Sequence, residues 1–311
     1  MCSKKRQSNR EPRPTLLLDF MQEQIDQLKM SNRFGTAVNY EKVRRSISRF
    51  VKTHGFPLSA ISERFVTEYN AFLVRKGMVR NSISFHMRVL RAIYNKAVRQ
   101  KLVIQTYPFS DVYTGIDKTR KRAVAESVLV QLHRMKLPER TPLAFARDLF
   151  IFSYCTRGMA FVDIAFLKRS CLKNGEICYA RHKTGQILTI RIEPTMQKII
   201  DRYSQCNSDY VFPIISSTVP ENAYRQYQNA INRYNRQLRK LSRMLNPDTR
   251  LTSYTARHSW ATAARNHSVP ISVISAGMGH TSEKITRVYL ASLENSVIDN
   301  ANRKIIKALM R

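Results

Sequence analysis

The chain has 311 residues, of which 43% are hydrophobic, a content typical of a globular protein. Its 53 Lys and Arg residues outnumber its 22 Asp and Glu residues, so the formal net charge is +31. This excess favours a polyanionic partner, because neutralising phosphates releases their counterions. An acidic membrane surface is the weaker alternative, because no segment approaches the roughly 18 to 20 apolar residues of a spanning helix.

The five cysteines lack C-x-x-C spacing and predict neither a disulfide framework nor a zinc site. The first 14 residues are basic and contain no apolar segment of the kind found in signal peptides. We therefore expect a cytoplasmic protein with reduced thiols, no metal site and no membrane anchor.

Residues 1–13 are polar and basic, and we expect them to form a disordered arm. Between residues 14 and 104, apolar side chains recur at helical spacing and predict four helices and no strand. Ser62 is the expected N-cap of the third helix. Short loops between four such helices predict a compact N-terminal bundle. The apolar positions that mark the helices are Leu16, Leu17, Phe20, Ile25 and Leu28; Tyr40, Val43, Ile47, Phe50 and Val51; Phe65, Tyr69, Phe72 and Leu73; and Ile83, Met87, Leu90, Ile93 and Tyr94.

The second and fourth of these helices are rich in basic residues. Arg44 and Arg45 lie on the second, and Arg88 and Arg91 lie on the fourth. For any one of them a solvated helix face is at least as good an explanation as a binding role. As a group they favour DNA binding, because basic stripes on two helices of one bundle can straddle a groove.

Residues 105–122 differ in composition from their surroundings and predict an interdomain linker. They contain Pro108, Gly115 and a basic cluster that ends with Lys121 and Arg122. These two residues could cross a DNA backbone. The alternative is a flexible hinge whose charges only keep it hydrated.

The remaining residues, 123–311, predict a second and mostly helical domain. Apolar spacing indicates helices near residues 126–132, 142–154, 195–203 and 221–244. Strand-like alternation at Ile177 and Tyr179 and again at Leu188, Ile190 and Ile192 flanks the turn Lys183-Thr184-Gly185. The expected fold class is therefore mainly α, with one small β-hairpin in the second domain.

The stretch from residue 251 to residue 290 carries three groups suited to phosphate chemistry. Arg257 opens a helix that runs to Ala264, and a second helix after Pro270 should stop at Gly277 or Gly279. His280 follows Arg257 by 23 residues, and Tyr289 follows His280 by nine, on a third expected helix.

The strings ARHSWATAA and GMGHTSEKITRVYL, which hold these residues, resemble the carboxy-terminal signature of the tyrosine recombinase (phage integrase) family. The usual form of that signature is H-x-x-R-H-[ST]-x-A-[ST], then L-G-H, then T-x-x-Y. Order, residue type and interval together carry the resemblance, and one departure is that Tyr254 stands where the family has its first His. The resemblance implies a SAM-like core-binding domain followed by a catalytic domain of the DNA breaking-rejoining fold.

The resemblance also implies a role for each site residue. Tyr289 would be the nucleophile that forms a 3′-phosphotyrosyl link, and Arg257 would hold the nonbridging phosphate oxygens. Lys183, in the K-T-G string of the hairpin turn, would protonate the departing 5′ oxygen. His280 would bind the phosphate or help to deprotonate Tyr289. Tyr254 can donate a hydrogen bond to the phosphate but cannot act as a base near neutral pH.

The family's first Arg is displaced in this chain. The usual motif T-G-L-R-x-x-E-L has an Arg three residues before an acid, but here Ala160 stands three residues before Asp163. Arg157 lies six residues before Asp163, and on a helix it would point to nearly the same side as Ala160. We expect Arg157 to replace the family's first Arg. The alternative is a surface Arg in a partly degenerate site.

The implied partner is double-stranded DNA with specific crossover sites, on which the protein assembles as a tetramer. A host accessory DNA-bending protein is a further partner that the resemblance suggests. No cofactor is implied, and the location would be the bacterial cytoplasm, in association with the nucleoid. A non-catalytic DNA-binding or architectural protein on the same scaffold is one alternative, favoured by Tyr254 and the displaced Arg157. A type IB topoisomerase-like enzyme is another alternative, and only the assembly state distinguishes it from a recombinase.

Overall fold

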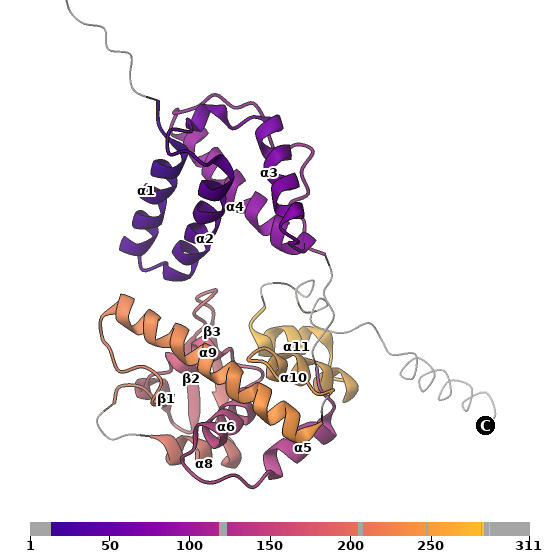
Figure 1. Cartoon of the computed structure of the whole chain (residues 1–311). Helices are drawn as coiled ribbons and strands as arrows, with labels where there is room; N and C mark the ends of the chain where they lie inside the picture. The colour runs from indigo at the N-terminus through magenta and orange to yellow at the C-terminus, as the bar shows by residue number, and fades with distance from the viewer. Residues whose placement is uncertain are drawn as a thin grey trace, which may run out of the picture. The chain divides into compact units, whose positions relative to one another are not determined.

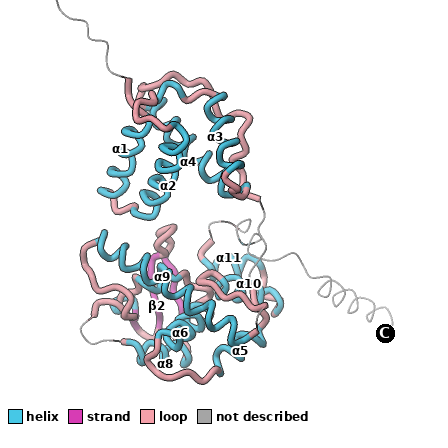
Figure 2. The backbone as a smooth tube through the Cα atoms, viewed as in Figure 1, coloured by secondary structure: helices cyan, strands magenta, loops and turns pink. Residues whose placement is uncertain are grey.

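The computed structural model describes residues 14–117, 123–204, 208–246 and 248–280, together with Ser282 and Thr286. The chain divides into two compact units, residues 1–118 and 119–311. Helices dominate both, and the described strands all belong to the second unit (Figure 2). No helix within the described residues is both long enough and apolar enough to cross a membrane. The predicted fold class, mainly α with a small β element, is confirmed.

The first unit contains the four predicted helices. They are α1 (Leu17–Met30), α2 (Phe34–Val51), α3 (Glu63–Arg75) and α4 (Arg80–Arg99), with a short 3-10 turn, η1, at Leu58–Ala60. The side-chain oxygen of Ser62 accepts a hydrogen bond from the backbone N–H of Phe65 at 3.3 Å, which confirms the predicted cap. Helices α1 and α2 lie side by side (Figure 1), and the apolar faces of all four helices share one core.

Most of the described part of the expected linker packs against this first unit. The ring of Phe109 is buried, 6.0 Å from the ring of Tyr94. The side-chain amide of Asn81 hydrogen-bonds both the carbonyl and the N–H of Asp117, at 3.1 and 2.8 Å. Within the expected linker, the ring of Phe109 and the hydrogen-bonded backbone of Asp117 therefore belong to the packing of the first unit. Lys121 and Arg122 lie outside the described residues.

The second unit surrounds a buried helix and carries a small antiparallel sheet. Its helices are α5 (Glu126–Arg134), α6 (Pro142–Cys155), α7 (Phe161–Ala165), α8 (Pro194–Tyr203), α9 (Pro220–Leu245), α10 (Thr255–Asn266) and α11 (Ile271–Met278), with a 3-10 turn, η2, at Arg169–Cys171. The strands are β1 (Leu172–Lys173), β2 (Glu176–Ala180) and β3 (Ile187–Arg191), in the order β1-β2-β3. The predicted hairpin is β2 and β3, paired from Glu176↔Arg191 to Ala180↔Ile187. The short strand β1 was not predicted.

Helix α6 is the centre of the second unit. It begins at its cap Thr141, whose hydroxyl accepts a hydrogen bond from the N–H of Ala144 at 3.2 Å, and it packs against α5, α8, α9 and α10. Its apolar side chains are buried on most sides, so α6 forms a rigid support for the chain segment that follows it.

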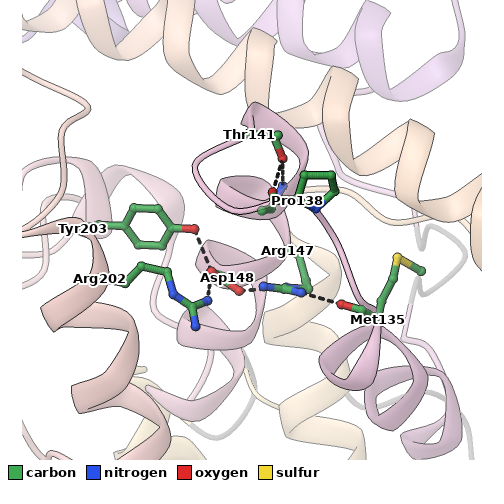
Figure 3. A network of polar contacts seen from close by, with 8 residues as sticks. Met135, Pro138, Thr141, Arg147, Asp148, Arg202 and Tyr203 are labelled. Atoms are coloured by element: carbon green, nitrogen blue, oxygen red, sulfur yellow. Dashed lines mark hydrogen bonds and ion pairs between the residues drawn. The ribbon is translucent and has the colours of Figure 1, made fainter.

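A buried carboxylate ties α6 to the end of α8 (Figure 3). Asp148 accepts hydrogen bonds from Arg147 Nε at 2.8 Å, Arg202 Nη1 at 2.7 Å and Tyr203 Oη at 2.7 Å. Burial alone would raise the pKa of Asp148, but these three donors together lower it. The charge is thus compensated where it is buried, as a buried carboxylate requires.

Candidate active site

The site begins at the turn that ends α6. Arg157 and Gly158 have φ angles of +59° and +75°, and α7 starts only at Phe161. Arg157 and Asp163 therefore do not share one helix, and the expectation that Arg157 reaches the site from a helical turn was wrong. A left-handed C-terminal turn, closed by a hydrogen bond from Gly158 N–H to the Ser153 carbonyl at 2.8 Å, directs Arg157 instead.

This turn lies directly against the first turn of α10. A Cβ atom built on Gly158 would be 2.6 Å from Arg257 Cα, a distance that real Cβ atoms do not adopt. The Gly158 carbonyl accepts a hydrogen bond from Arg257 Nη1 at 2.9 Å. Glycine at this position thus allows both the left-handed backbone and the close approach to Arg257.

Arg257 and His280, which the sequence analysis placed in one site, are in contact. The Arg257 side chain is buried, and its Nη2 donates to the Met278 carbonyl at 2.6 Å and lies 2.9 Å from His280 Nε2. Because a guanidinium only donates hydrogen bonds, His280 Nε2 is the acceptor. The ring proton of a neutral His280 is then on Nδ1, which donates to Thr286 Oγ1 at 2.8 Å.

The surroundings of His280 keep its imidazole neutral. Burial, followed by the charges of Arg257, Arg181 and Lys183, lowers the pKa of His280 to about 4. At neutral pH the ring is therefore uncharged, and its Nε2 lone pair accepts a hydrogen bond.

This shift predicts a pH dependence of stability. Between about pH 4 and the ordinary His pKa near 6.5, the unfolded chain binds more protons at this position than the folded chain, so stability falls as the pH is lowered through that window. We expect the urea midpoint of wild type to fall more steeply from pH 6.5 to pH 4 than that of His280→Asn. The fluorescence of Trp260, the single tryptophan, reports the unfolding of the second unit.

His133→Asn is the matched control, because His133 is an exposed histidine on α5 of the same unit. Its pH profile should follow that of wild type. A His280→Asn profile parallel to wild type would contradict a lowered pKa for His280.

The hairpin turn between β2 and β3 brings Lys183 into this group. Lys183 is exposed, and its positive charge is one of those that lower the pKa of His280. Asp163, the acid of the displaced motif, accepts a hydrogen bond from the backbone N–H of His182 at 2.7 Å, beside Lys183. Burial raises the pKa of Asp163, against the effect of that hydrogen bond. Helix α7 is thereby attached to the turn that carries Lys183.

The side chain of Arg157 lies beside Gly277 of α11. A Cβ atom on Gly277 would lie 3.6 Å from Arg157 Cδ and 3.2 Å from the ring of Trp260. Tyr179, on β2, has its pKa raised by burial, and the charges of Arg257, Arg181 and Arg157 oppose that rise. Helices α10 and α11 lie beside each other in Figure 1.

Arg181 is a polar residue of the site that was not predicted from the sequence. Arg181 is 8% exposed, and its Nη1 donates a hydrogen bond to the carbonyl of Gly279, next to His280. The alternation of β2 contained the signal, because Ile177, Tyr179 and Arg181 are two residues apart and all three are buried. A charged residue at the end of a strand is ordinarily expected to face solvent. The two-residue alternation of buried side chains was therefore not extended from Tyr179 to Arg181.

Two further predicted site residues are Tyr254 and Tyr289. Tyr254 precedes α10 and is 50% exposed, with its ring 6.5 Å from that of His258. Tyr289 lies outside the described residues, but Thr286, three positions before it, is buried against His280.

The predicted DNA-contact residues of the first unit differ in what they touch. Arg45 is exposed and pairs with Glu41 at 2.6 Å. Arg91 is exposed and donates to Thr114 Oγ1 at 3.1 Å. Arg88 is half-buried on α4. The Nε of Arg44 donates to the carbonyl of Leu18 at 3.1 Å, so this side chain joins α2 to α1.

The mainly helical first unit has the SAM-like fold, and the helical unit with a three-stranded antiparallel sheet that follows it has the DNA breaking-rejoining fold. The sequence model of the phage integrase family matches residues 132–296, and that of the phage integrase SAM-like domain matches residues 16–112. The chain therefore belongs to the phage integrase family, the tyrosine recombinases.

Solved structures with this fold cover most of the chain. The Tn1549 transposon integrase in complex with a circular intermediate DNA is 16% identical to this chain, with a TM-score of 0.62. The aligned region covers 92% of this chain and 98% of the integrase chain. A lambda integrase dimer bound to a COC′ core site is 15% identical, covers 89% and 96%, and has a TM-score of 0.66. A lambda integrase tetramer bound to a Holliday junction is 14% identical, covers 89% and 78%, and has a TM-score of 0.64. No curated protein sequence matches the chain.

Proposed function

We propose that this protein is a site-specific DNA recombinase, an integrase or invertase, that cuts and rejoins DNA through a 3′-phosphotyrosyl intermediate. The observation that carries the proposal is the contact between the buried Arg257 and a neutral His280 in a member of the phage integrase family. A buried cation beside a neutral base suits a reaction that must bind a phosphate and also move a proton.

Arg257 and Arg157 bind the nonbridging oxygens of the scissile phosphate. Guanidinium suits this role because its forked donors match phosphate geometry and it stays protonated. Without DNA, the Arg257 donors are directed at the carbonyls of Gly158 and Met278 and at His280. The phosphate replaces some of these acceptors, and Tyr254 can add one hydrogen bond from its hydroxyl.

Tyr289 is the nucleophile, and His280 assists it. An unperturbed tyrosine has a pKa near ~10, so at neutral pH it needs a base. When Nη2 of Arg257 turns from His280 to the phosphate, the Nε2 lone pair becomes available to accept the proton of the Tyr289 hydroxyl. The hydrogen bond from Nδ1 to Thr286 keeps the ring oriented during this exchange.

Lys183 donates the proton that the departing 5′ oxygen needs. The Tyr289 oxygen bonds to phosphorus, the bond to the 5′ oxygen breaks, and that oxygen leaves as a hydroxyl with the proton of Lys183. The phosphodiester energy is retained in the tyrosyl link, so the reverse reaction rejoins a strand without ATP.

The partners follow from the same chemistry. The substrate is double-stranded DNA with crossover sites, and four copies of the protein bring two duplexes together, as in the lambda integrase tetramer on a Holliday junction. A host DNA-bending protein is a possible accessory. The excess of Lys and Arg favours association with the bacterial nucleoid. Basic side chains of the first unit, including Arg45 and Arg91, contact the DNA backbone.

The decisive experiment is the trapping of a covalent adduct. We expect wild type to form a protein–DNA adduct, seen by denaturing gel, on nicked duplexes drawn from the DNA that flanks its own gene. Tyr289→Phe should form none, because it lacks the attacking oxygen, and Arg157→Ala should form far less. Tyr107→Phe is the control, because Tyr107 is an exposed tyrosine of the first unit, and it should react like wild type.

The alternatives predict different results. Tight, salt-sensitive DNA binding without an adduct on any site would favour an architectural DNA-binding protein. An adduct together with relaxation of supercoiled DNA by a monomer would favour a type IB topoisomerase-like enzyme.

A further inference from the structure

The turn that carries Lys183 is closed on the backbone of Arg181. The Arg181 N–H donates to the carbonyl of Gln186 at 2.8 Å, and the Arg181 carbonyl accepts from the N–H of Thr184 at 3.3 Å and of Gly185 at 2.8 Å. Lys183 stands within this closed loop. Its position is therefore set by the position of Arg181.

The side chain of Arg181 joins the same turn to the end of α11. Its Nη1 donates to the carbonyl of Gly279, which caps α11 in the left-handed conformation, and the next residue is His280. A Cβ atom on Gly279 would lie 2.8 Å from Arg181 Cδ and 3.0 Å from Leu188 Cδ1. The hairpin and the helix end are thus in direct contact through Arg181.

The environment of Arg181 is unusual for an arginine. The side chain is buried, yet within the described part of the chain no carboxylate oxygen lies within 4.0 Å of its guanidinium. Burying a cation without an ion pair costs folding free energy, so an apolar residue at this position would favour the stability of the fold. In the proposed reaction Arg181 itself transfers no proton, although its charge is one of those that lower the pKa of His280.

We propose that Arg181 is a positioning residue, which holds the turn of Lys183 against the end of α11 that carries His280. It acts on the departing 5′ oxygen through Lys183. This inference depends on the proposed function, in which Lys183 is the proton donor.

The test compares two leaving groups at the same scissile phosphate. One nicked duplex carries the ordinary bridging 5′ oxygen, and the other carries sulfur there. A 5′ thiol has a pKa near ~8.5, far below that of an alcohol, so the sulfur departs as a thiolate and needs no proton. With the sulfur substrate the proton of Lys183 is no longer required.

We expect Arg181→Met, which keeps length and loses the donor, to slow adduct formation on the oxygen substrate by about 100-fold. On the sulfur substrate its rate should return to within about fivefold of wild type, as should that of Lys183→Ala, because both lose only proton donation. Arg181→Lys keeps a donor and should lie between Arg181→Met and wild type on the oxygen substrate. Arg191→Met is the matched control, because Arg191 is exposed on β3, and it should react like wild type on both.

Rescue of Lys183→Ala without rescue of Arg181→Met would overturn the role of Arg181 and leave the proposed function intact. Rescue of neither would overturn the role of Lys183, and the inference with it. If the fluorescence of Trp260 shows that Arg181→Met does not fold, the comparison of the two substrates is made with Arg181→Lys. A defect of that variant equal on both substrates then contradicts positioning.

Discussion

Arg257→Lys is expected to lower the rate of covalent adduct formation by about a thousandfold. The guanidinium uses two nitrogens to reach the carbonyls of Gly158 and Met278 and the ring of His280. A lysine keeps the charge but has one nitrogen, and it lacks the planar fork that binds two phosphate oxygens at once. The charge alone therefore does not preserve the activity. The rate is measured on a nicked duplex at saturating DNA.

Arg134→Lys is the matched control, because Arg134 is an exposed arginine at the end of α5. It should cut at the wild-type rate. Urea unfolding followed by Trp260 fluorescence distinguishes lost chemistry from lost structure. If folded Arg257→Lys retained more than about a tenth of the wild-type rate, the forked contact with phosphate would not be required.

Gly158→Ala is expected to lower the free energy of unfolding of the second unit by about 4 kcal/mol, of which about 1 kcal/mol comes from the left-handed backbone and up to about 3 kcal/mol from overpacking. The new methyl group would meet Arg257 Cα at 2.6 Å and Arg257 Cβ at 2.8 Å. These atoms belong to the beginning of a buried helix and cannot move aside as the end of a flexible side chain can.

Gly175→Ala separates the two causes. Gly175 has a φ angle of +74°, close to the +75° of Gly158, but a Cβ atom there would have nothing within 4 Å. We expect this variant to lose only about 1 kcal/mol. Equal losses in the two variants would show that the contact with Arg257 contributes nothing. Both are measured by urea unfolding with Trp260 as the probe.

The helices could be predicted because their apolar spacing is a local property of the sequence. The four helices of the first unit and the cap at Ser62 follow from spacing and cap chemistry, and of the two glycines at which α11 was expected to stop, Gly279 is the cap. The family signature likewise placed Arg257 and His280 in one site, and the structure brings them into contact.

The remaining features depend on contacts between distant segments. Arg157 was assigned to a helix, because the local sequence does not indicate that Arg157 and Gly158 both adopt left-handed backbone conformations. Residues up to Asp117 were assigned to a linker, because the pairing of Asp117 with Asn81 joins positions far apart in the sequence. The burial of Arg181 follows from the packing of the hairpin against Gly279, which the sequence of β2 alone does not specify.

In the proposed mechanism, the hydrogen bond between His280 and Thr286 also restricts which copy of the protein can supply the attacking tyrosine. Thr286 is three positions before Tyr289, and three extended residues span at most roughly 10 Å. While this bond remains, the chain between Thr286 and position 289 is a short tether, whose length limits how far the proposed nucleophile can lie from His280 of its own subunit. Cleavage in cis leaves the tether in place. If the tyrosine instead attacks in trans, at a site of another subunit farther away than that span, the bond must break. His280 of the subunit that receives the tyrosine is then oriented by a segment from another copy.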